Sequence, residues 1–312
     1  MSSNRFTTGL LLALLGSIAF SGKAIIVKLA YRYGVDAVTL LMYRMLFSLP
    51  FFAIMAWWAS RGKAALTKHD WFGVLGLGFT GYYLASYLDF AGLAYITASL
   101  ERLILYINPT LVLIMAWLLY KKPISARQIA AMALSYSGIL LVFGHELVMQ
   151  EFGAGGGMTT SAANTVWGSF LVFASAISYA IYLGYSGELV KRLGSLRLVG
   201  LATTVACVLC ILQFVMMRPI SAMQVAPEVI WLSLLNATLC TALPVVAVMM
   251  AIERIGAPLA AQTGMIGPMS TILMGVFILG EPLTLWVVLG TVLVLSGVYW
   301  VSRGNGRGRA KA

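Results

Sequence analysis

Ten apolar runs, each about long enough to cross a bilayer, constrain this chain more than any other feature. The hydrocarbon core of a membrane is about 30 Å thick, so a spanning helix needs roughly 20 residues. Within lipid, an α-helix satisfies its own backbone hydrogen bonds. The sequence therefore predicts an all-α polytopic membrane protein with ten transmembrane helices. The expected spans are 8–29, 37–58, 71–95, 98–120, 128–143, 165–190, 198–217, 229–252, 258–279 and 283–301.

Composition indicates that lipid is the main solvent, because the chain lacks the polar surface of a water-soluble protein. Hydrophobic residues make up 61% of the 312 positions and charged residues 10%, and the mean hydropathy is +0.92. The net charge of +11 raises nucleic acid as a partner, but the basic residues lie mostly in short loops between the apolar runs. Such loops orient helices during insertion, so we expect a lipid bilayer and no nucleic acid.

The positions of the basic residues predict the orientation of the chain. If the N-terminus is cytoplasmic, 15 of the 21 Lys and Arg residues lie on the inner side, and the outer loops keep Arg32 and Arg218. Lys and Arg resist translocation, so we expect an integral protein of a bacterial cytoplasmic membrane with both termini inside. The first run continues past Gly22 and Lys23 without a cleavage site, which favours a retained helix over a signal peptide.

A shift of 159 positions aligns the chain with itself. The shift pairs Pro109 with Pro268 and Pro123 with Pro282, and residues 94–139 hold ten identities in 46 positions. Each half contains five predicted helices, an odd number, so the second half inserts upside down. We expect a first repeat at 1–150, a Gly-rich connector at 151–164, an inverted second repeat at 165–302 and a basic cytoplasmic tail at 303–312.

Motifs at corresponding helix junctions carry a resemblance to a known family. They are Gly280-Glu281-Pro282-Leu283-Thr284 with Gly290 and Ser296-Gly297-Val298, residues 251–257 with Pro268, residues 93–99 with Pro109, and Lys28 and Arg44. Over essentially the whole chain, this pattern resembles the EamA-type branch of the drug/metabolite transporter superfamily. The first repeat departs from the pattern, since it carries Lys122 where the second carries Glu281.

The resemblance implies a ten-helix carrier of amino acids, metabolites or drugs, with a cavity lined by helices 1, 3, 4, 6, 8 and 9. Some members of this family export amino acids, including aromatic ones. The 14 tyrosines of this chain make such a small-molecule substrate the preferred hypothesis. We expect no obligate protein partner.

Ionisable side chains inside the spans are candidates for function, because each costs at least about 2.5 kcal/mol near a helix centre. Lys23 lies deep in the first helix and either contacts substrate or forms a structural ion pair. Asp89 and Glu101 flank the short turn between the third and fourth helices. We expect Asp89 and Arg44 to form a structural pair, Glu101 to contact substrate, and Arg102 to have a structural or gating role.

Polar faces on the third and sixth helices predict part of a substrate site. Tyr82 and Ser86 share one face of the third helix with Asp89. Tyr179 and Tyr182 lie on the sixth helix, which is the inverted-repeat partner of the first. Tyrosine rings and hydroxyl groups would suit an aromatic substrate, and ordinary packing between helices is the alternative.

Neutral polar residues and prolines complete the candidate set. Asn236 and Gln262, in the eighth and ninth helices, either join helices or contact substrate. Pro109 and Pro268 remove backbone hydrogen bonds at equivalent points of the two halves and so favour bending. With Glu281, these prolines are expected to serve structure or gating.

The sequence predicts a transporter without a cofactor, a metal or an enzymatic activity. It contains no G-x-x-x-x-G-K-[ST] loop for a nucleotide, and His69 and His145 fall at opposite membrane edges. The leading hypothesis is a secondary carrier or facilitator that exports amino acids or related metabolites by alternating access. The alternative is a proton-coupled multidrug or cation exporter in which Glu101 or Asp89 alternately binds proton and substrate.

Overall fold

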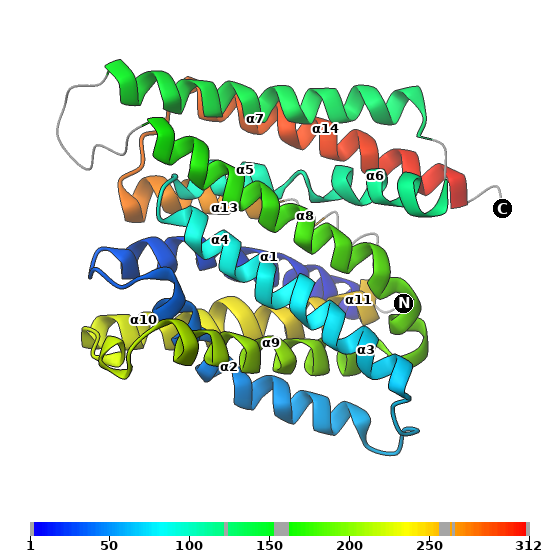
Figure 1. Ribbon diagram of the computed structural model, residues 1–312. Coiled ribbons are helices and arrows are strands. Elements are labelled where there is room, and N and C mark those ends of the chain that lie inside the picture. Colours follow the sequence, from blue (N-terminus) through cyan, green and yellow to red (C-terminus); the bar gives the residue numbers. More distant parts are fainter. Residues whose placement is uncertain (1–2, 122–123, 153–161, 256–262, 264–265, 310–312) are drawn as a thin grey trace. The chain divides into compact units, whose positions relative to one another are not determined.

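The computed structural model describes residues 3–121, 124–152, 162–255, 263 and 266–309, and helices account for most of them (Figure 1). The first half contains α1 (Ser3–Tyr31), α2 (Ala37–Ser60), α3 (Lys68–Leu77), η1 (Gly78–Leu84), α4 (Ala85–Leu93), α5 (Ala98–Leu105), α6 (Asn108–Tyr120) and α7 (Ala126–Phe152). The second half contains α8 (Ala162–Leu193), α9 (Ser195–Met217), η2 (Ile220–Met223), α10 (Pro227–Ala237), η3 (Thr238–Ala242), α11 (Leu243–Ile255), α13 (Gly267–Met274), η4 (Gly275–Leu279) and α14 (Leu285–Arg309).

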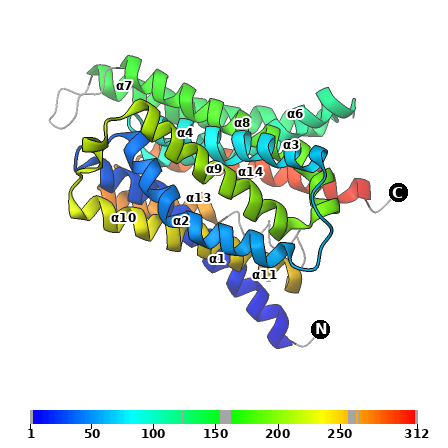
Figure 2. The ribbon, with the colours of Figure 1, turned by 60° about the horizontal axis from the view of Figure 1, so that its bottom comes forward.

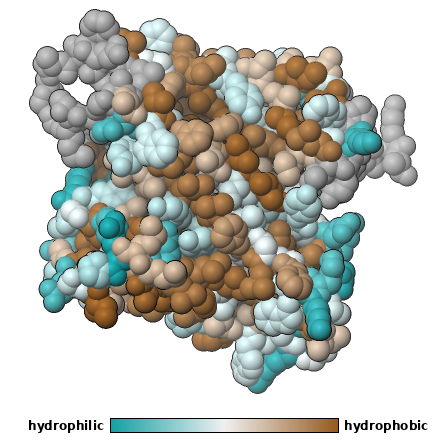
Figure 3. Space-filling view, viewed as in Figure 1, coloured by the Kyte–Doolittle hydropathy of each residue, from teal (hydrophilic) through white to brown (hydrophobic). Residues whose placement is uncertain are grey.

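The helices match a polytopic membrane protein. Within the described part of the chain, seven helical stretches are long and apolar enough to cross a membrane, and shorter apolar helices lie at Met269–Leu279 and Leu285–Gly297. Large apolar side chains such as Phe72 and Phe277 are 76% and 83% exposed, and Figure 3 shows apolar residues over much of one face. Lipid would cover such a surface, so the predicted all-α membrane fold is confirmed.

Two helices continue beyond their expected ends. α7 runs past position 143 to Phe152, and α14 runs past position 301 to Arg309, into the expected basic tail. The expected ends marked where hydropathy falls. Helical hydrogen bonds do not require apolar side chains, so a helix can continue after its apolar stretch ends.

The chain forms two compact units, and each combines helices from both sequence repeats. Unit 1 consists of Met1–Gly78 and Leu193–Glu281, and unit 2 of Phe79–Arg192 and Pro282–Ala312. Within unit 1, α2 packs along α9, and within unit 2, α7 packs along α14 (Figures 1 and 2). Each helix of these pairs is the 159-position equivalent of the other, so the two repeats are interleaved.

The contact between α7 and α14 has the form expected of a two-fold axis. A Cβ atom added at Gly138 would lie 2.6 Å from the Gly290 carbonyl oxygen, and one added at Gly297 would lie 2.5 Å from the Ala131 carbonyl oxygen. The 159-position shift converts Gly138 to Gly297 and Ala131 to Gly290. The two approaches are therefore symmetry equivalents, as in an isologous interface.

α1 and α8, the first helices of the two repeats, show the same equivalence inside their separate units. A Cβ atom added at Gly9 of α1 would lie 2.5 Å from Cγ2 of Ile255, and one added at Gly168 of α8 would lie 2.9 Å from Cγ2 of Ile96. The 159-position shift converts Gly9 to Gly168 and Ile96 to Ile255, so the two contacts are equivalent. Small residues let membrane helices approach closely, so these two glycines have one packing role in the two repeats.

Asp36 links two loops at one end of unit 1. Its carboxylate caps α2 by accepting from the Val38 and Thr39 amides, and it pairs with Arg218 Nε at 3.2 Å. Burial acts to raise the pKa of Asp36, but the bonds from Thr39 and Val38 and the charge of Arg218 outweigh it, so the pKa lies below its ordinary 3.8. The ionised form is therefore the one that stabilises the fold.

We expect Asp36→Ala to lower the free energy of unfolding by about 1 kcal/mol, mainly through loss of the helix cap. Asp36→Asn keeps a capping oxygen and loses a half-exposed ion pair, so its effect should stay below about 0.5 kcal/mol. Because the folded-state pKa is depressed, the wild-type advantage should be complete above pH 5 and fade as the pH falls below about 3.8. Thermal unfolding of the three proteins between pH 3 and 7 measures this, and equal losses in both variants would contradict the capping role.

Candidate functional site

The third and eighth predicted spans, which form α3–α4 and α10–α11, are each interrupted by a π-helical segment at equivalent positions. The segments are η1 at Gly78–Leu84 and η3 at Thr238–Ala242, and a shift of 159 carries 78–84 onto 237–243. A π turn changes the register of the backbone hydrogen bonds and frequently marks a functional site. The interruption is therefore a shared feature of the two repeats.

Hydroxyl groups of α8 bind carbonyl groups in and beside η1. Ser178 Oγ donates to the Thr80 carbonyl and Ser175 Oγ to the Ala85 carbonyl, both at 2.7 Å. These bonds hold α8 against η1 and the start of α4 in unit 2. They also explain why hydroxyl groups occur on the buried face of α8.

A buried cationic cluster lies where α1, α2, α10 and η3 meet in unit 1. Arg44 Nε donates to Thr241 Oγ1 at 3.2 Å, and Thr241 Oγ1 donates to the Asn236 carbonyl at 2.8 Å. Asn236 Nδ2 donates to the Lys23 carbonyl at 3.4 Å. The four residues are at most 9% exposed. Thr241 thus connects Arg44 with Asn236, and the Asn236 side chain reaches the backbone of Lys23. The sequence predicted Lys23, Arg44 and Asn236 as separate candidates.

This cationic cluster has the chemistry to bind an anion. Lys23 and Arg44 supply positive charge, and Arg44 Nε donates to the neutral Thr241 hydroxyl. Asn236 Oδ1 and the Ser233 hydroxyl are buried without a hydrogen-bond partner among the described residues. The amide oxygen can accept a hydrogen bond from a polar ligand, and the hydroxyl can accept or donate one. A carboxylate would gain charge-assisted hydrogen bonds here.

A tyrosine cluster lies in unit 2 where η1 meets α8. The hydroxyl oxygens of Tyr82 and Tyr182 are 3.1 Å apart, and their rings meet edge to face with centroids 5.1 Å apart. The rings of Tyr179 and Tyr182 are stacked at 5.5 Å. The absence of a side chain at Gly81 makes room for the Tyr182 ring. Ser86, one turn beyond Tyr82, is half-buried on α4.

The cationic cluster and the tyrosine cluster occupy equivalent places in the two repeats. The 159-position shift converts Lys23 to Tyr182 and Tyr82 to Thr241. The same two repeat positions therefore hold Lys23 and Thr241 in unit 1, and Tyr182 and Tyr82 in unit 2. This difference breaks the internal symmetry at the residues that are best suited to bind a ligand.

Acidic and basic side chains are also buried in unit 2. Asp89 on α4 is 2% exposed, and Glu101 and Arg102 on α5 are 0% and 8% exposed. The expected pair between Asp89 and Arg44 would join residues of different units, and it stays a prediction.

Pro109 and Pro268 lie in the first turns of α6 and α13, just after equivalent N-cap residues. Proline has no amide hydrogen, so Pro109 leaves the Leu105 carbonyl without its helical donor. Asn108 Nδ2 donates to that carbonyl instead, at 2.8 Å. The break between α5 and α6 is therefore stabilised by a local side chain.

The start of α13 is bound to α1 by hydroxyl groups that the sequence did not identify. Ser21 Oγ donates to the Gly267 carbonyl at 2.9 Å, and Thr271 Oγ1 lies 3.3 Å from the Ser21 carbonyl. Single hydroxyl residues in apolar helices are common. The sequence therefore gave no signal for this contact beyond the neighbouring Pro268.

Glu281 is half-buried and follows Gly280, whose φ of 75° places it in the left-handed region. Its amide donates to the Gly275 carbonyl at 3.1 Å. Lys121, the repeat equivalent of Gly280, has a φ of 51°, so both repeats end this helix with a left-handed residue. Gln262 lies outside the described residues.

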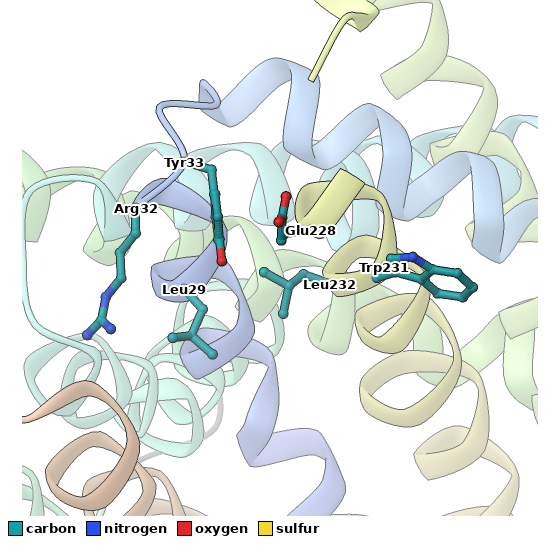
Figure 4. A pocket seen from close by; sticks show the side chains of 6 residues that line it. All are labelled: Leu29, Arg32, Tyr33, Glu228, Trp231 and Leu232. Carbon is teal, nitrogen blue, oxygen red and sulfur yellow. The ribbon is translucent and has the colours of Figure 1, made fainter. Parts of the chain in front are cut away.

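A cavity of about 350 Å³ at one end of unit 1 contains none of the predicted site residues (Figure 4). Leu29, Tyr33 and Glu228 line it, but the Arg32 guanidinium is directed elsewhere and donates to the Leu279 carbonyl at 2.9 Å. The buried clusters are therefore the better candidates for a transport site.

Comparisons with known proteins identify the family of this chain. Residues 7–144 and 166–303 each match the model of the EamA-like transporter family. An uncharacterized transporter, YcbK, of Bacillus subtilis (strain 168) is 30% identical over 302 residues, covering 95% of this chain and 92% of the relative. An uncharacterized transporter of Archaeoglobus fulgidus is 23% identical over 292 residues, covering 94% and 96%.

A solved crystal structure shares the fold at 16% identity, with a TM-score of 0.59 over 94% of this chain and 96% of its own. The two family matches divide the chain as the 159-position repeat does. Transport, a membrane location and two related halves thus follow from independent observations. The chain belongs to the EamA-like transporter family.

Proposed function

We propose that this transporter exports amino acids, preferentially aromatic or other neutral ones, by alternating access. The cationic cluster of unit 1 supports this proposal, because Lys23, Arg44, Asn236 and Thr241 place positive charge beside hydrogen-bonding groups within the membrane. A carboxylate is the anionic group common to all amino acids. Burying these cations is costly unless they serve a partner or a ligand.

The tyrosine cluster supports an aromatic substrate. Tyr82, Tyr179 and Tyr182 present aromatic faces and edges together with hydroxyl groups. Such surfaces favour edge-to-face and offset contacts with an aromatic ring. Ser86, one turn from Tyr82, would add a polar contact to the substrate, and Gln262 stays a predicted contact outside the described residues.

The π segments and the helix breaks would permit the movement. A π segment and a proline-linked break allow a helix to bend without losing many hydrogen bonds. In this proposal, structural or gating roles belong to Pro109, Pro268, Glu281, Arg102 and Asp89. We further propose that the protein lies in a bacterial cytoplasmic membrane with both termini inside.

The burial of Asp89 and Glu101 favours a second candidate, a proton-coupled exporter of drugs or organic cations. A carboxylate that is alternately protonated and bound to a cation would couple the two movements. In this candidate Glu101 contacts substrate and Glu101→Gln abolishes the dependence of transport on pH.

Ligand-dependent thermal stability separates the two candidates. A ligand that binds the folded carrier alone raises its melting temperature. We expect phenylalanine, tyrosine or tryptophan to stabilise the purified protein, and 3-phenylpropionate, which keeps the carboxylate, to do so more weakly. Phenethylamine, which lacks the carboxylate, should have little effect. Stabilisation by the amine and not by the amino acids would favour the cation exporter and contradict the leading proposal.

We expect Tyr82→Ala to remove most of the stabilisation by aromatic amino acids, since it deletes an aromatic contact worth about 0.5–1.5 kcal/mol and a hydroxyl group. Tyr185→Ala is the matched control, because Tyr185 lies on α8 and is 49% exposed. Normal membrane insertion of both variants, with a normal ligand response in Tyr82→Ala, would exclude the tyrosine cluster from the site.

A further inference from the structure

A basic cavity of about 340 Å³ lies in unit 1 between the end of α2 and the start of α9. Arg61, Lys63 and Arg197 line it together with Trp58 and Gly194. The volume lies within the roughly 300–1,000 Å³ that small-molecule sites occupy. The cavity is separate from both clusters discussed above, since it shares no residue with them.

The three cations around this cavity have neutral partners. Lys63 Nζ donates to the Leu193 carbonyl at 3.4 Å. Arg197, which is 6% exposed, donates from Nε to Ser60 Oγ at 3.1 Å and from Nη2 to the Ala64 carbonyl at 3.0 Å.

The Arg61 guanidinium lies 3.8 Å from the centre of the Trp57 ring. Across the described ranges, no carboxylate forms an ion pair with any of the three cations. Among the described residues, the cavity is therefore lined by positive charge that no carboxylate pairs.

The first turn of α9 adds to this positive potential. Gly194 is the N-cap residue, has a φ of 85° and provides no side-chain cap, so the first amide hydrogens of α9 have no capping oxygen. A Cβ atom added at Gly194 would lie 3.4 Å from Lys63 Nζ, which places the ammonium group beside this helix terminus. A helix N-terminus with a neighbouring cation favours a phosphate or another anion.

Two exposed tryptophans indicate the depth of this cavity in the membrane. Trp57 and Trp58 are 59% and 64% exposed at the end of α2. Tryptophan concentrates at the level of the lipid headgroups, and basic pockets on the cytoplasmic side bind anionic headgroups. The basic loops predict that this end of α2 is cytoplasmic.

We propose that this cavity binds the phosphate headgroup of an anionic phospholipid, with its acyl chains in the bilayer beside α2. Arg61 and Lys63 contact the phosphate, and Arg197 holds the loop after α2 in place through Ser60 and Ala64. The lipid would join the ends of two repeat-equivalent helices, α2 and α9.

Native mass spectrometry of the full-length protein in detergent, titrated with phosphatidylglycerol or phosphatidylcholine, tests the proposal. We expect phosphatidylglycerol to bind preferentially. In the double variant Arg61→Gln/Lys63→Gln its affinity should fall roughly thirtyfold, since each basic side chain near an anionic surface contributes about fivefold.

The matched control is Lys68→Gln/Lys191→Gln, which removes the same charge from exposed positions at the same predicted membrane side. The affinity of this control should stay within about threefold of wild type. Equal losses in both double variants would overturn the site and indicate general electrostatic attraction. Equal binding of phosphatidylcholine would overturn the preference for an anionic headgroup. Complete displacement of phosphatidylglycerol by millimolar inorganic phosphate would overturn the lipid as the occupant.

Discussion

Replacing Lys23 by glutamine is expected to lower the transport efficiency for aromatic amino acids roughly 10- to 100-fold. A hydrogen bond to a charged group contributes about 1.5–3 kcal/mol. Glutamine keeps a polar side chain, slightly shorter than that of lysine, and loses the charge. The loss should appear mainly as a raised KM in proteoliposome uptake. Lys23→Arg should retain more activity than Lys23→Gln, since it keeps the charge.

Lys28→Gln is the control for Lys23→Gln, because Lys28 lies on the same helix and is half-buried near its end. We expect near-normal uptake in this variant. If Lys23→Gln transports phenylalanine with an unchanged KM, the cationic cluster does not bind the substrate carboxylate. A similar loss in Lys23→Gln and Lys28→Gln would assign both lysines to stability or insertion.

Substituting Gly138 by alanine is expected to destabilise the protein by about 1–3 kcal/mol, the usual range for overpacking. The new Cβ atom would lie 2.6 Å from the Gly290 carbonyl oxygen, and backbone cannot move aside as a flexible side chain can. α7 and α14 would have to separate along their length. Thermal unfolding in detergent, monitored by loss of monodisperse protein, measures the change.

Gly144→Ala is the control on the same helix, because nothing lies within 4 Å of a Cβ atom at Gly144. This variant should be neutral or slightly more stable, since alanine favours a helix over glycine. The two-fold relation predicts that Gly297→Ala resembles Gly138→Ala. Equal stability of Gly138→Ala and Gly144→Ala would contradict the close approach of the two helices.

The helices, the repeat and the family could be predicted from sequence, because each depends on a pattern along the chain. Apolar runs of helical length gave the spans, and the coincidence of Pro109 with Pro268 gave the shift between repeats. The same shift also relates contacts in the structure, since Gly9 and Gly168 contact equivalent isoleucines in different units.

The π segments could not be predicted, because a π turn has no distinctive composition. η1 contains glycine, tyrosine and threonine, and η3 contains threonine, alanine and cysteine, all of which an ordinary helix also tolerates. A carbonyl of η1 also binds a side chain from another helix. Ser178, which binds the Thr80 carbonyl, lies 98 positions away in sequence.

The residues of the candidate site could be predicted one by one, but their grouping in space could not. Lys23 and Arg44 stood out because charge is rare in membrane spans. That they connect through Thr241 and Asn236 required the arrangement of α1, α2 and α10, which no local pattern specifies.

Counterflow of radiolabelled amino acids in proteoliposomes is the most direct test of the proposed transport function. Vesicles preloaded with unlabelled phenylalanine should accumulate labelled phenylalanine, tyrosine and tryptophan, and Lys23→Gln should reduce the rate at subsaturating substrate. Accumulation without a pH gradient is the result expected of a facilitator. If preloaded vesicles exchange no amino acid, with or without a pH gradient, while they exchange organic cations, the carboxylate-binding role of the cationic cluster is wrong.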